Sequence, residues 1–345
     1  MVILRVYISL FLFSFLYANT FIFENKNLYY TNIATLNSLT HHLKYGINNF
    51  NKGYFLFSNQ VEYGVWYKQI YVSTFFKSIG FIKSNYNTVY LYYKLKNHLH
   101  LDDGSYKLLL KIYGYKANGI KIGSLYKRKY FFIRGGVNLL YAYMMQDLDG
   151  FGDAITKNSK SNYHSLINYY YTKNYIYDYY PDYSRGYGYS FYVNSVFHYK
   201  NIGISLKVED LKGTIWWNNL PYSEVNINTQ NEYYDDKGDV HYKSSIYGLE
   251  KNIKYTQLLK PFYTYKIFFK YKNFISSILN KRFWGFNWYI FELDYKNYSL
   301  NYNKYFKVYS LGFHNKNWMV KIGSNSLIFK RVNSFNVNLL FNQDF

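Results

Sequence analysis

The end of the chain, Phe335 to Phe345, reads FNVNLLFNQDF. In an extended segment, the apolar side chains of Phe335, Val337, Leu339 and Phe341 would share one face. The asparagines between them would share the other face. Such period-two alternation predicts a β-strand with a single apolar side. The terminal Phe345 keeps the apolar parity of this strand.

The same alternation recurs through much of the chain, most regularly in residues 187–199, 202–209, 298–303, 309–314 and 318–325. Short Tyr-Lys-Asn or Tyr-Lys-Gln corners stand at 67–70, 199–202, 271–274 and 295–298. Because Asn tolerates the left-handed backbone that tight turns require, these corners predict β-hairpins. Two stretches without this rhythm, 147–185 and 213–243, are expected to be longer loops.

The composition also favours strands. Of the 345 residues, 24% are aromatic and 18% are charged, with 48 Tyr, 29 Phe and only 3 Pro. Aromatic residues favour strands, whereas helices need Ala, Glu and Leu, so helical bundles and Rossmann-type folds are not expected. The absence of cysteine excludes disulfides, thiolate metal sites and cysteine nucleophiles. The net charge is +21, but the lysines are scattered rather than clustered, so no nucleic-acid partner is expected.

The N-terminal residues 1–18 predict a secretory signal peptide. One positive charge, Arg5, precedes an apolar run from Val6 to Tyr17, and Ala18 supplies a small residue for cleavage. The apolar run is too short for a membrane-spanning helix. Residues 19–52 are less regular and are expected to form a periplasmic or plug-like segment, followed by a β-domain over residues 53–345.

Two all-β architectures fit this pattern: a secreted β-sandwich and a transmembrane β-barrel. A sandwich would show a charged outer face, whereas here the polar face carries Ser, Asn, Gly, Lys and Tyr, and the apolar face is densely aromatic. Tyr and Trp near strand ends suit a membrane interface. We therefore predict an antiparallel transmembrane β-barrel of about 16 strands, within a range of roughly 14 to 18.

The C-terminal strand resembles the signature of Gram-negative outer-membrane β-barrel proteins, of the porin-like kind, in which a terminal Phe closes an amphipathic strand. Val337, Leu339, Phe341 and Phe345 carry this resemblance, while Gln343 stands where the family usually has an apolar residue. The resemblance implies location in the cell outer membrane. It also implies contact with membrane lipid and lipopolysaccharide, and recognition by the barrel-assembly machinery.

Motifs for chemistry are sparse. Asp147, Asp149 and Asp153, with glycines between them, resemble half of a calcium loop but lack its closing Glu. The alternative is a Gly- and Asp-rich loop without metal. No GxSxG, HExxH or P-loop motif is present. We therefore expect neither an enzyme nor a cofactor.

If the apolar face meets lipid, the other face lines the lumen. The inward residues would include Lys94, Lys96, Lys107, Lys111, Lys121, Lys207, Lys266, Lys270, Lys272 and Lys321, against Glu62, Glu209, Glu292 and Asp294. Rings of lysine favour anions. The first functional hypothesis is a passive porin-like channel for small solutes that prefers anions. The alternative is a plugged or narrow structural barrel that docks to another envelope assembly or secretion system. The oligomeric state is left open.

Overall fold

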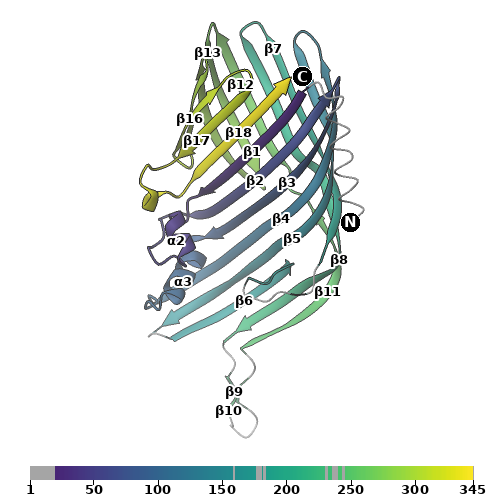
Figure 1. Ribbon diagram of the computed structural model, residues 1–345. Helices are drawn as coiled ribbons and strands as arrows, with labels where there is room; N and C mark the ends of the chain where they lie inside the picture. Colours follow the sequence, from purple (N-terminus) through teal and green to yellow (C-terminus); the bar gives the residue numbers. More distant parts are fainter. Residues whose placement is uncertain are drawn as a thin grey trace.

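The computed structural model describes residues 20–157, 160–175, 181, 184–229, 232–234, 240–242 and 245–344. Its strands form a closed antiparallel barrel (Figure 1). Fourteen strands make the barrel and two more pair outside it, which confirms the predicted all-β barrel and places its strand number within the expected range. In the described residues, no helix is long and apolar enough to cross a membrane.

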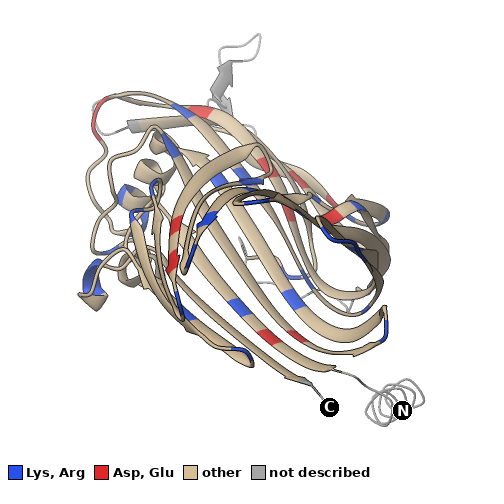
Figure 2. Cartoon of the chain, turned by 90° about the horizontal axis from the view of Figure 1, so that it is seen from above, with Lys and Arg blue, Asp and Glu red and all other residues tan. Residues whose placement is uncertain are grey.

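The barrel ring follows the chain order and closes between its two ends. Its strands are β1 (Thr20–Thr31), β2 (Lys52–Tyr67), β3 (Ile70–Asn85), β4 (Gly104–Lys127), β5 (Phe131–Lys157), β7 (Gly186–Tyr199), β8 (Ile202–Asn228), β12 (Phe262–Tyr271), β13 (Phe274–Phe283), β14 (Phe286–Tyr295), β15 (Tyr298–Asn303), β16 (Val308–His314), β17 (Trp318–Ser324) and β18 (Phe335–Asp344). β1 pairs with both β18 and β2. This pairing closes the ring, and Figure 2 shows it from one end.

One end of the barrel carries short turns together with the chain's C-terminal strand end (Figure 1). The Tyr-Lys-Asn and Tyr-Lys-Gln corners all lie here, joining β2 to β3, β7 to β8, β12 to β13 and β14 to β15. The left-handed residue in each corner is the lysine, Lys68, Lys200, Lys272 or Lys296, rather than the asparagine. We call this the turn end.

The opposite end, called the loop end, carries the longer connections. They hold the helices α2 (Leu36–Thr40) and α3 (Tyr86–Lys96) and the 3₁₀ turn η1 (Phe329–Arg331). The Asn85 side chain caps α3 by accepting from the Thr88 amide at 3.1 Å. β6 (Lys160–Tyr171) and β11 (Ile246–Leu258) lengthen the wall beyond the ring by pairing with β5 and β8. A small separate hairpin, β9 (Glu232–Tyr234) and β10 (Val240–Tyr242), stands beyond them.

Three expectations about segment boundaries need correction. Residues 20–31 are not plug-like but form barrel strand β1, because alternate residues from Glu24 to Tyr30 face the lumen while pairing runs along both edges. The expected loops at 147–185 and 213–243 begin instead as continuations of β5 and β8. Both strands are long, and part of each extends beyond the ring. Those parts lack clean period-two alternation, so the sequence pattern indicates loops there. The predicted signal peptide, 1–18, lies outside the described residues.

Candidate functional site: a chamber in the barrel lumen

The two faces of the barrel wall differ sharply in chemistry. The outward face is apolar around the ring, with exposed Ile122, Leu139, Phe191, Ile204, Ile267, Phe269, Ile278, Phe291, Leu293, Leu300, Leu311 and Ile322. The inward face of the same strands carries the polar and charged residues that line the internal cavity. A closed barrel with an outward apolar band is the architecture of transmembrane β-barrels.

Aromatic side chains fill the lumen toward the loop end. We call this group the aromatic layer, and it comprises Tyr30, Tyr54, Phe81, Tyr113, Phe262, Phe283, Trp284, Phe286, Trp288 and Phe306. Phe81 and Phe283 are fully buried at 0% exposure. The apolar cluster to which these rings belong draws buried residues from β1 to β5 and from β8, β13, β14 and β16, so it receives side chains from most of the ring.

Rings from opposite walls touch within this layer. Tyr54 on β2 stacks on Phe286 on β14 with ring centroids 4.3 Å apart, although β15, β16, β17, β18 and β1 separate their strands. Phe81 on β3 meets Phe283 on β13 at 5.6 Å. Such contacts leave no open passage between these side chains. The wall's own residues therefore narrow the lumen at this level.

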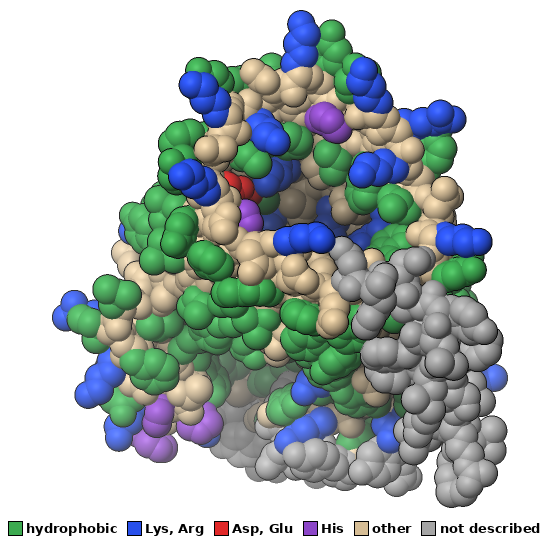
Figure 3. All heavy atoms as spheres, turned by 45° about the horizontal axis from the view of Figure 1, so that its top comes forward, with side chains coloured by type: hydrophobic (Ala, Val, Ile, Leu, Met, Phe, Trp, Pro, Cys, Tyr) green, Lys and Arg blue, Asp and Glu red, His purple; other side chains and the backbone are tan. Residues whose placement is uncertain are grey.

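Between the aromatic layer and the turn end lies a cavity of about 290 Å³, which we call the chamber. Its apolar floor includes Tyr30, Phe262 and Ile290, and its walls carry lysines, glutamates and amides. The charged residues that line it are Lys26, Lys77, Lys207, Glu209, Lys281, Glu292 and Lys321. Seen from the turn end, the surface is hollowed and lysine or arginine side chains stand around the hollow (Figure 3).

A second hollow connects the chamber with the turn end. Its volume is about 370 Å³, and it shares Glu292 and Lys321 with the chamber. It also reaches His314 and Lys316 next to the β16–β17 turn. Three lysines, Lys266, Lys316 and Lys321, outnumber the two acids Glu292 and Asp294 in its lining, so solutes at the turn end meet a basic entrance before they reach the chamber.

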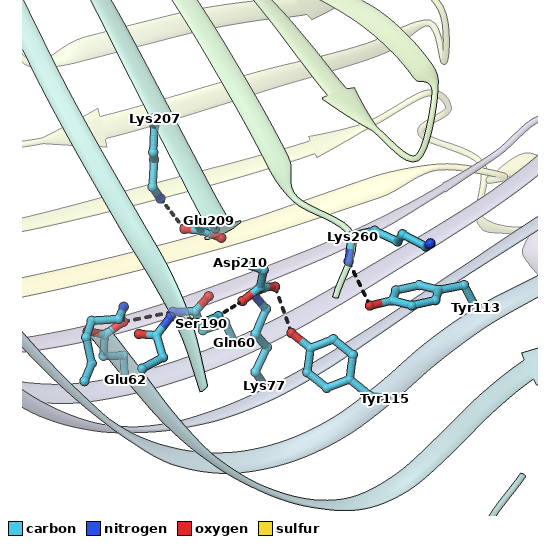
Figure 4. A network of polar contacts seen from close by, with 12 residues as sticks. Gln60, Glu62, Lys77, Tyr113, Tyr115, Ser190, Lys207, Glu209, Asp210 and Lys260 are labelled. Carbon is cyan, nitrogen blue, oxygen red and sulfur yellow. Dashed lines mark hydrogen bonds and ion pairs between the residues drawn. The ribbon is translucent and has the colours of Figure 1, made fainter. Parts of the chain in front are cut away.

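Asp210 is the centre of a buried polar network (Figure 4). Its carboxylate accepts from Lys77 Nζ at 2.5 Å, from Tyr115 Oη at 2.8 Å and from Ser190 Oγ at 3.0 Å. Asp210 is 1% exposed, and its partners come from β3, β4 and β7. A buried carboxylate needs such compensation, because burying an unpaired charge is costly. This network ties β3 and β4 to β8 across the lumen and adds a side-chain contact between the paired strands β7 and β8.

Two glutamates hold further inward charges in place. Glu62 accepts from Lys121 Nζ at 2.6 Å and from the hydroxyls of Tyr71 and Ser73, both at 2.8 Å. Glu292 accepts from two lysines, Lys266 at 2.5 Å and Lys321 at 2.9 Å. These two carboxylates are thus engaged by lysines or hydroxyls.

The predicted pore-lining lysines fall into four groups. Lys121, Lys207, Lys266 and Lys321 lie inside the barrel, as the alternation indicates. Lys107, Lys111 and Lys270 share the inward parity of their strands but lie near strand ends, outside the chamber lining. Lys272 lies in the β12–β13 turn. Lys94 and Lys96 do not line a pore, because their segment forms helix α3 at the loop end, where Lys94 lies 3.9 Å from Asp102.

The structure does not support the resemblance to half of a calcium loop. Asp147, Asp149 and Asp153 lie along strand β5, which spreads them out rather than wrapping them around one point. Asp149 pairs with Lys111 at 2.9 Å, and Asp147 accepts from Tyr255 Oη at 3.1 Å. Within the described ranges, no group of three or more His, Cys, Asp or Glu residues is placed to hold a metal ion.

Sequence reasoning missed several inward charges. Lys26 lies in the N-terminal segment that was not assigned to the barrel, and Lys77 follows the doubled Phe75 and Phe76, which obscures the alternation of β3. Asp210 adjoins Glu209, and both face inward because the β7–β8 register shifts between Tyr189 and Val193. Such bulges break the period-two pattern on which the assignment depends.

Three of the residues that resemble a C-terminal assembly signal, Val337, Leu339 and Phe341, lie on strand β18. Asn336 and Asn338 line the chamber, so the alternating Val337, Leu339 and Phe341 face outward, as predicted. Phe345 lies outside the described residues.

Comparison with known proteins gives no family. No protein-family model matches the chain, and no curated protein matches it. The outer membrane protease OmpT from Escherichia coli aligns over 94% of this chain and 97% of its own, at 8% identity and a TM-score of 0.26. OccAB3 from Acinetobacter baumannii aligns over 94% of this chain and 99% of its own, at 8% identity and a TM-score of 0.17. Similarity at this level assigns no activity to the chain.

Proposed function

We propose that this chain is an outer-membrane β-barrel with a lumen closed at the loop end and a chamber that small anions enter from the turn end. The observation that supports this most directly is the contact between rings from opposite walls, Tyr54 with Phe286 and Phe81 with Phe283. A diffusion channel needs a water-filled lumen, whereas in narrower barrels side chains fill the interior. In the resting state this barrel passes no steady flow of solute.

The outward face supports the membrane part of the proposal. Its apolar side chains, such as Ile267 at 63% exposure and Leu311 at 70%, would meet lipid and lipopolysaccharide. Short turns at one end and longer connections at the other match the periplasmic and extracellular ends of such barrels. On this basis the turn end is periplasmic. The outward residues of β18 would be available to the barrel-assembly machinery.

A porin-like channel with anion preference is the second candidate, because the chamber is lined by more lysines than acids. It requires the aromatic layer to move aside so that the chamber opens toward the loop end. Both candidates are passive and include no catalytic step. Two of the lumenal carboxylates, Glu62 and Glu292, are engaged by lysines and hydroxyls rather than free for acid–base chemistry.

Conductance in a planar lipid bilayer tests the closed lumen. The folded protein should show no steady conductance, while Phe286→Ala combined with Trp288→Ala should give stepwise openings, because both rings belong to the blocking layer. The matched control combines Phe291→Ala and Trp216→Ala, whose side chains are exposed on the outside, and it should stay closed. Steady conductance of the unmodified protein would refute the closed state and favour the porin-like channel.

The opened variant also tests the charge of the lumen. Wall lysines in a narrow pore are less screened than surface charges, so anions should carry most of the current, especially at low salt. The reversal potential under a salt gradient measures this preference. Lys321→Glu should shift it toward cations, whereas Lys200→Glu in the β7–β8 turn should change it much less. A cation preference of the opened variant would contradict the assignment of faces.

A further inference from the structure

We infer that the chamber holds a binding site for one small dianion, with Lys281 as its principal ligand. This inference deepens the proposed function and rests on the inward face described above. Lys281 lies on β13 and lines the chamber together with Lys207 and Lys321. In the part of the chain that the structure describes, no carboxylate lies within ion-pair distance of Lys281.

The formal charges around the chamber leave a surplus of two. Three lysines are each balanced by one acid: Lys26 by Glu24 at 2.6 Å, Lys77 by Asp210 at 2.5 Å and Lys207 by Glu209 at 2.6 Å. Glu292 is shared by Lys266 and Lys321, so these three groups together carry one positive charge. Asp294 and Lys316, which also line the outer hollow, add one formal charge of each sign and leave this count unchanged. The unpaired Lys281 adds a second. A bound dianion would neutralise both.

The shape and the remaining lining suit a small ligand. A volume of about 290 Å³ corresponds to roughly ten water molecules at about 30 Å³ each, which is enough for a phosphate or a short dicarboxylate with part of its hydration. Thr264, Asn301 and Asn338 add neutral polar groups to the walls. The floor of Tyr30, Phe262 and Ile290 offers an apolar surface to the carbon part of an organic dianion.

The entrance directs the ligand to this site from the turn end only. The outer hollow is lined by His314, Lys316 and Lys321, and it meets the chamber at Glu292 and Lys321. Because the aromatic layer blocks the other side, an anion that enters would bind and leave by the same route. The site is therefore expected to show saturable equilibrium binding without transport in the resting state.

Calorimetric titration of the folded full chain in detergent with inorganic phosphate, at neutral pH where phosphate is partly a dianion and the lysines of the chamber carry their charge, tests the site. We expect saturable binding of one phosphate per chain. Lys281→Met should weaken it at least tenfold, Lys281→Arg should retain it, and Lys127→Met at the exposed end of β4 should leave it unchanged. Succinate should compete with phosphate, and chloride at equal concentration should compete much less. Absence of saturable binding, or equal binding by Lys281→Met, would overturn the inference.

A second variant keeps the test decisive if Lys281→Met does not fold. Glu292→Gln removes the acid shared by Lys266 and Lys321, so it should tighten phosphate binding severalfold. Unchanged or weaker binding by this variant would also overturn the inference. The outcome is separable from that of the proposed function. A protein that conducts steadily yet binds phosphate through Lys281 would refute only the closed lumen, whereas one that is closed but binds no phosphate would refute only the anion site.

Discussion

The Asp210 network allows a stability prediction with a definite size. Asp210→Asn keeps the shape of the side chain and suits the local backbone, since residue 210 has φ of 56° and Asn tolerates that left-handed conformation. What the substitution removes is the negative charge beside Lys77, whose side chain is only 8% exposed. Breaking a buried ion pair by neutralising one partner costs about 3–5 kcal/mol, because the other charge stays buried without compensation. At the lower figure the folding equilibrium constant falls by more than about a hundredfold.

The measurement is equilibrium unfolding by urea in lipid vesicles, followed by tryptophan fluorescence. The matched control is Asp153→Asn, because Asp153 lies 3.9 Å from His164 with both side chains at least half exposed, and exposed pairs contribute about 1 kcal/mol or less. Lys77→Met combined with Asp210→Asn should recover much of the loss, since no buried charge is then left alone. If Asp210→Asn costs no more than the control, the network does not hold the strands together as described.

Two further predictions concern packing and orientation. Gly136→Ala should lower stability by about 1–3 kcal/mol, as overpacking does, because an added Cβ would lie 2.0 Å from the Ile122 carbonyl oxygen. At Gly104 the nearest atom would be 3.8 Å away, so Gly104→Ala should be nearly neutral in the same unfolding assay. The chain contains no cysteine, so a single cysteine can be labelled selectively on intact cells with an impermeant maleimide. Lys44→Cys after α2 should react and Lys200→Cys should not, whereas the reverse pattern would place the turn end outside the cell.

Period-two alternation predicted the barrel and much of its inward face. Successive side chains of a strand point to opposite faces of the wall, so the sequence itself separates inward from outward residues. Lys207, Lys321 and Glu292 follow from parity alone, and the structure places them inside. The alternation gave a wrong prediction where a segment with strand-like, period-two alternation forms a helix instead. Residues 86–96 also alternate, yet the Asn85 cap and the chain reversal at the loop end make them the helix α3. No local signal separates these outcomes, since tertiary context decides between them.

The aromatic layer inside the lumen could not be predicted for a different reason. Alternation identifies the lumenal face by its polar residues. Where an inward aromatic residue stands next to an outward one, the pattern does not show which of the two faces the lumen. Phe286 and Trp288 have inward parity on β14, while Tyr289 and Phe291 face outward, and the sequence there is apolar on both sides. Whether such rings meet across the barrel depends on their height and on the strands opposite them. The sequence of one strand contains neither the height of its rings in the barrel nor the identity of the residues opposite them.

The aromatic layer and the charges above it depend on each other physically. Tyr113 and Tyr115 lie on the same face of β4. Tyr113 belongs to the aromatic layer, whereas Tyr115 donates a hydrogen bond to Asp210. The apolar layer and the buried charges therefore meet along this one strand. Rings that exclude water lower the local dielectric and strengthen the ion pairs beside them. The same exclusion makes an uncompensated charge expensive, and it applies to Lys281 at the other side of the chamber. If the lumen is closed at the loop end as proposed, we expect this exclusion of water to increase the affinity of the chamber for an anion.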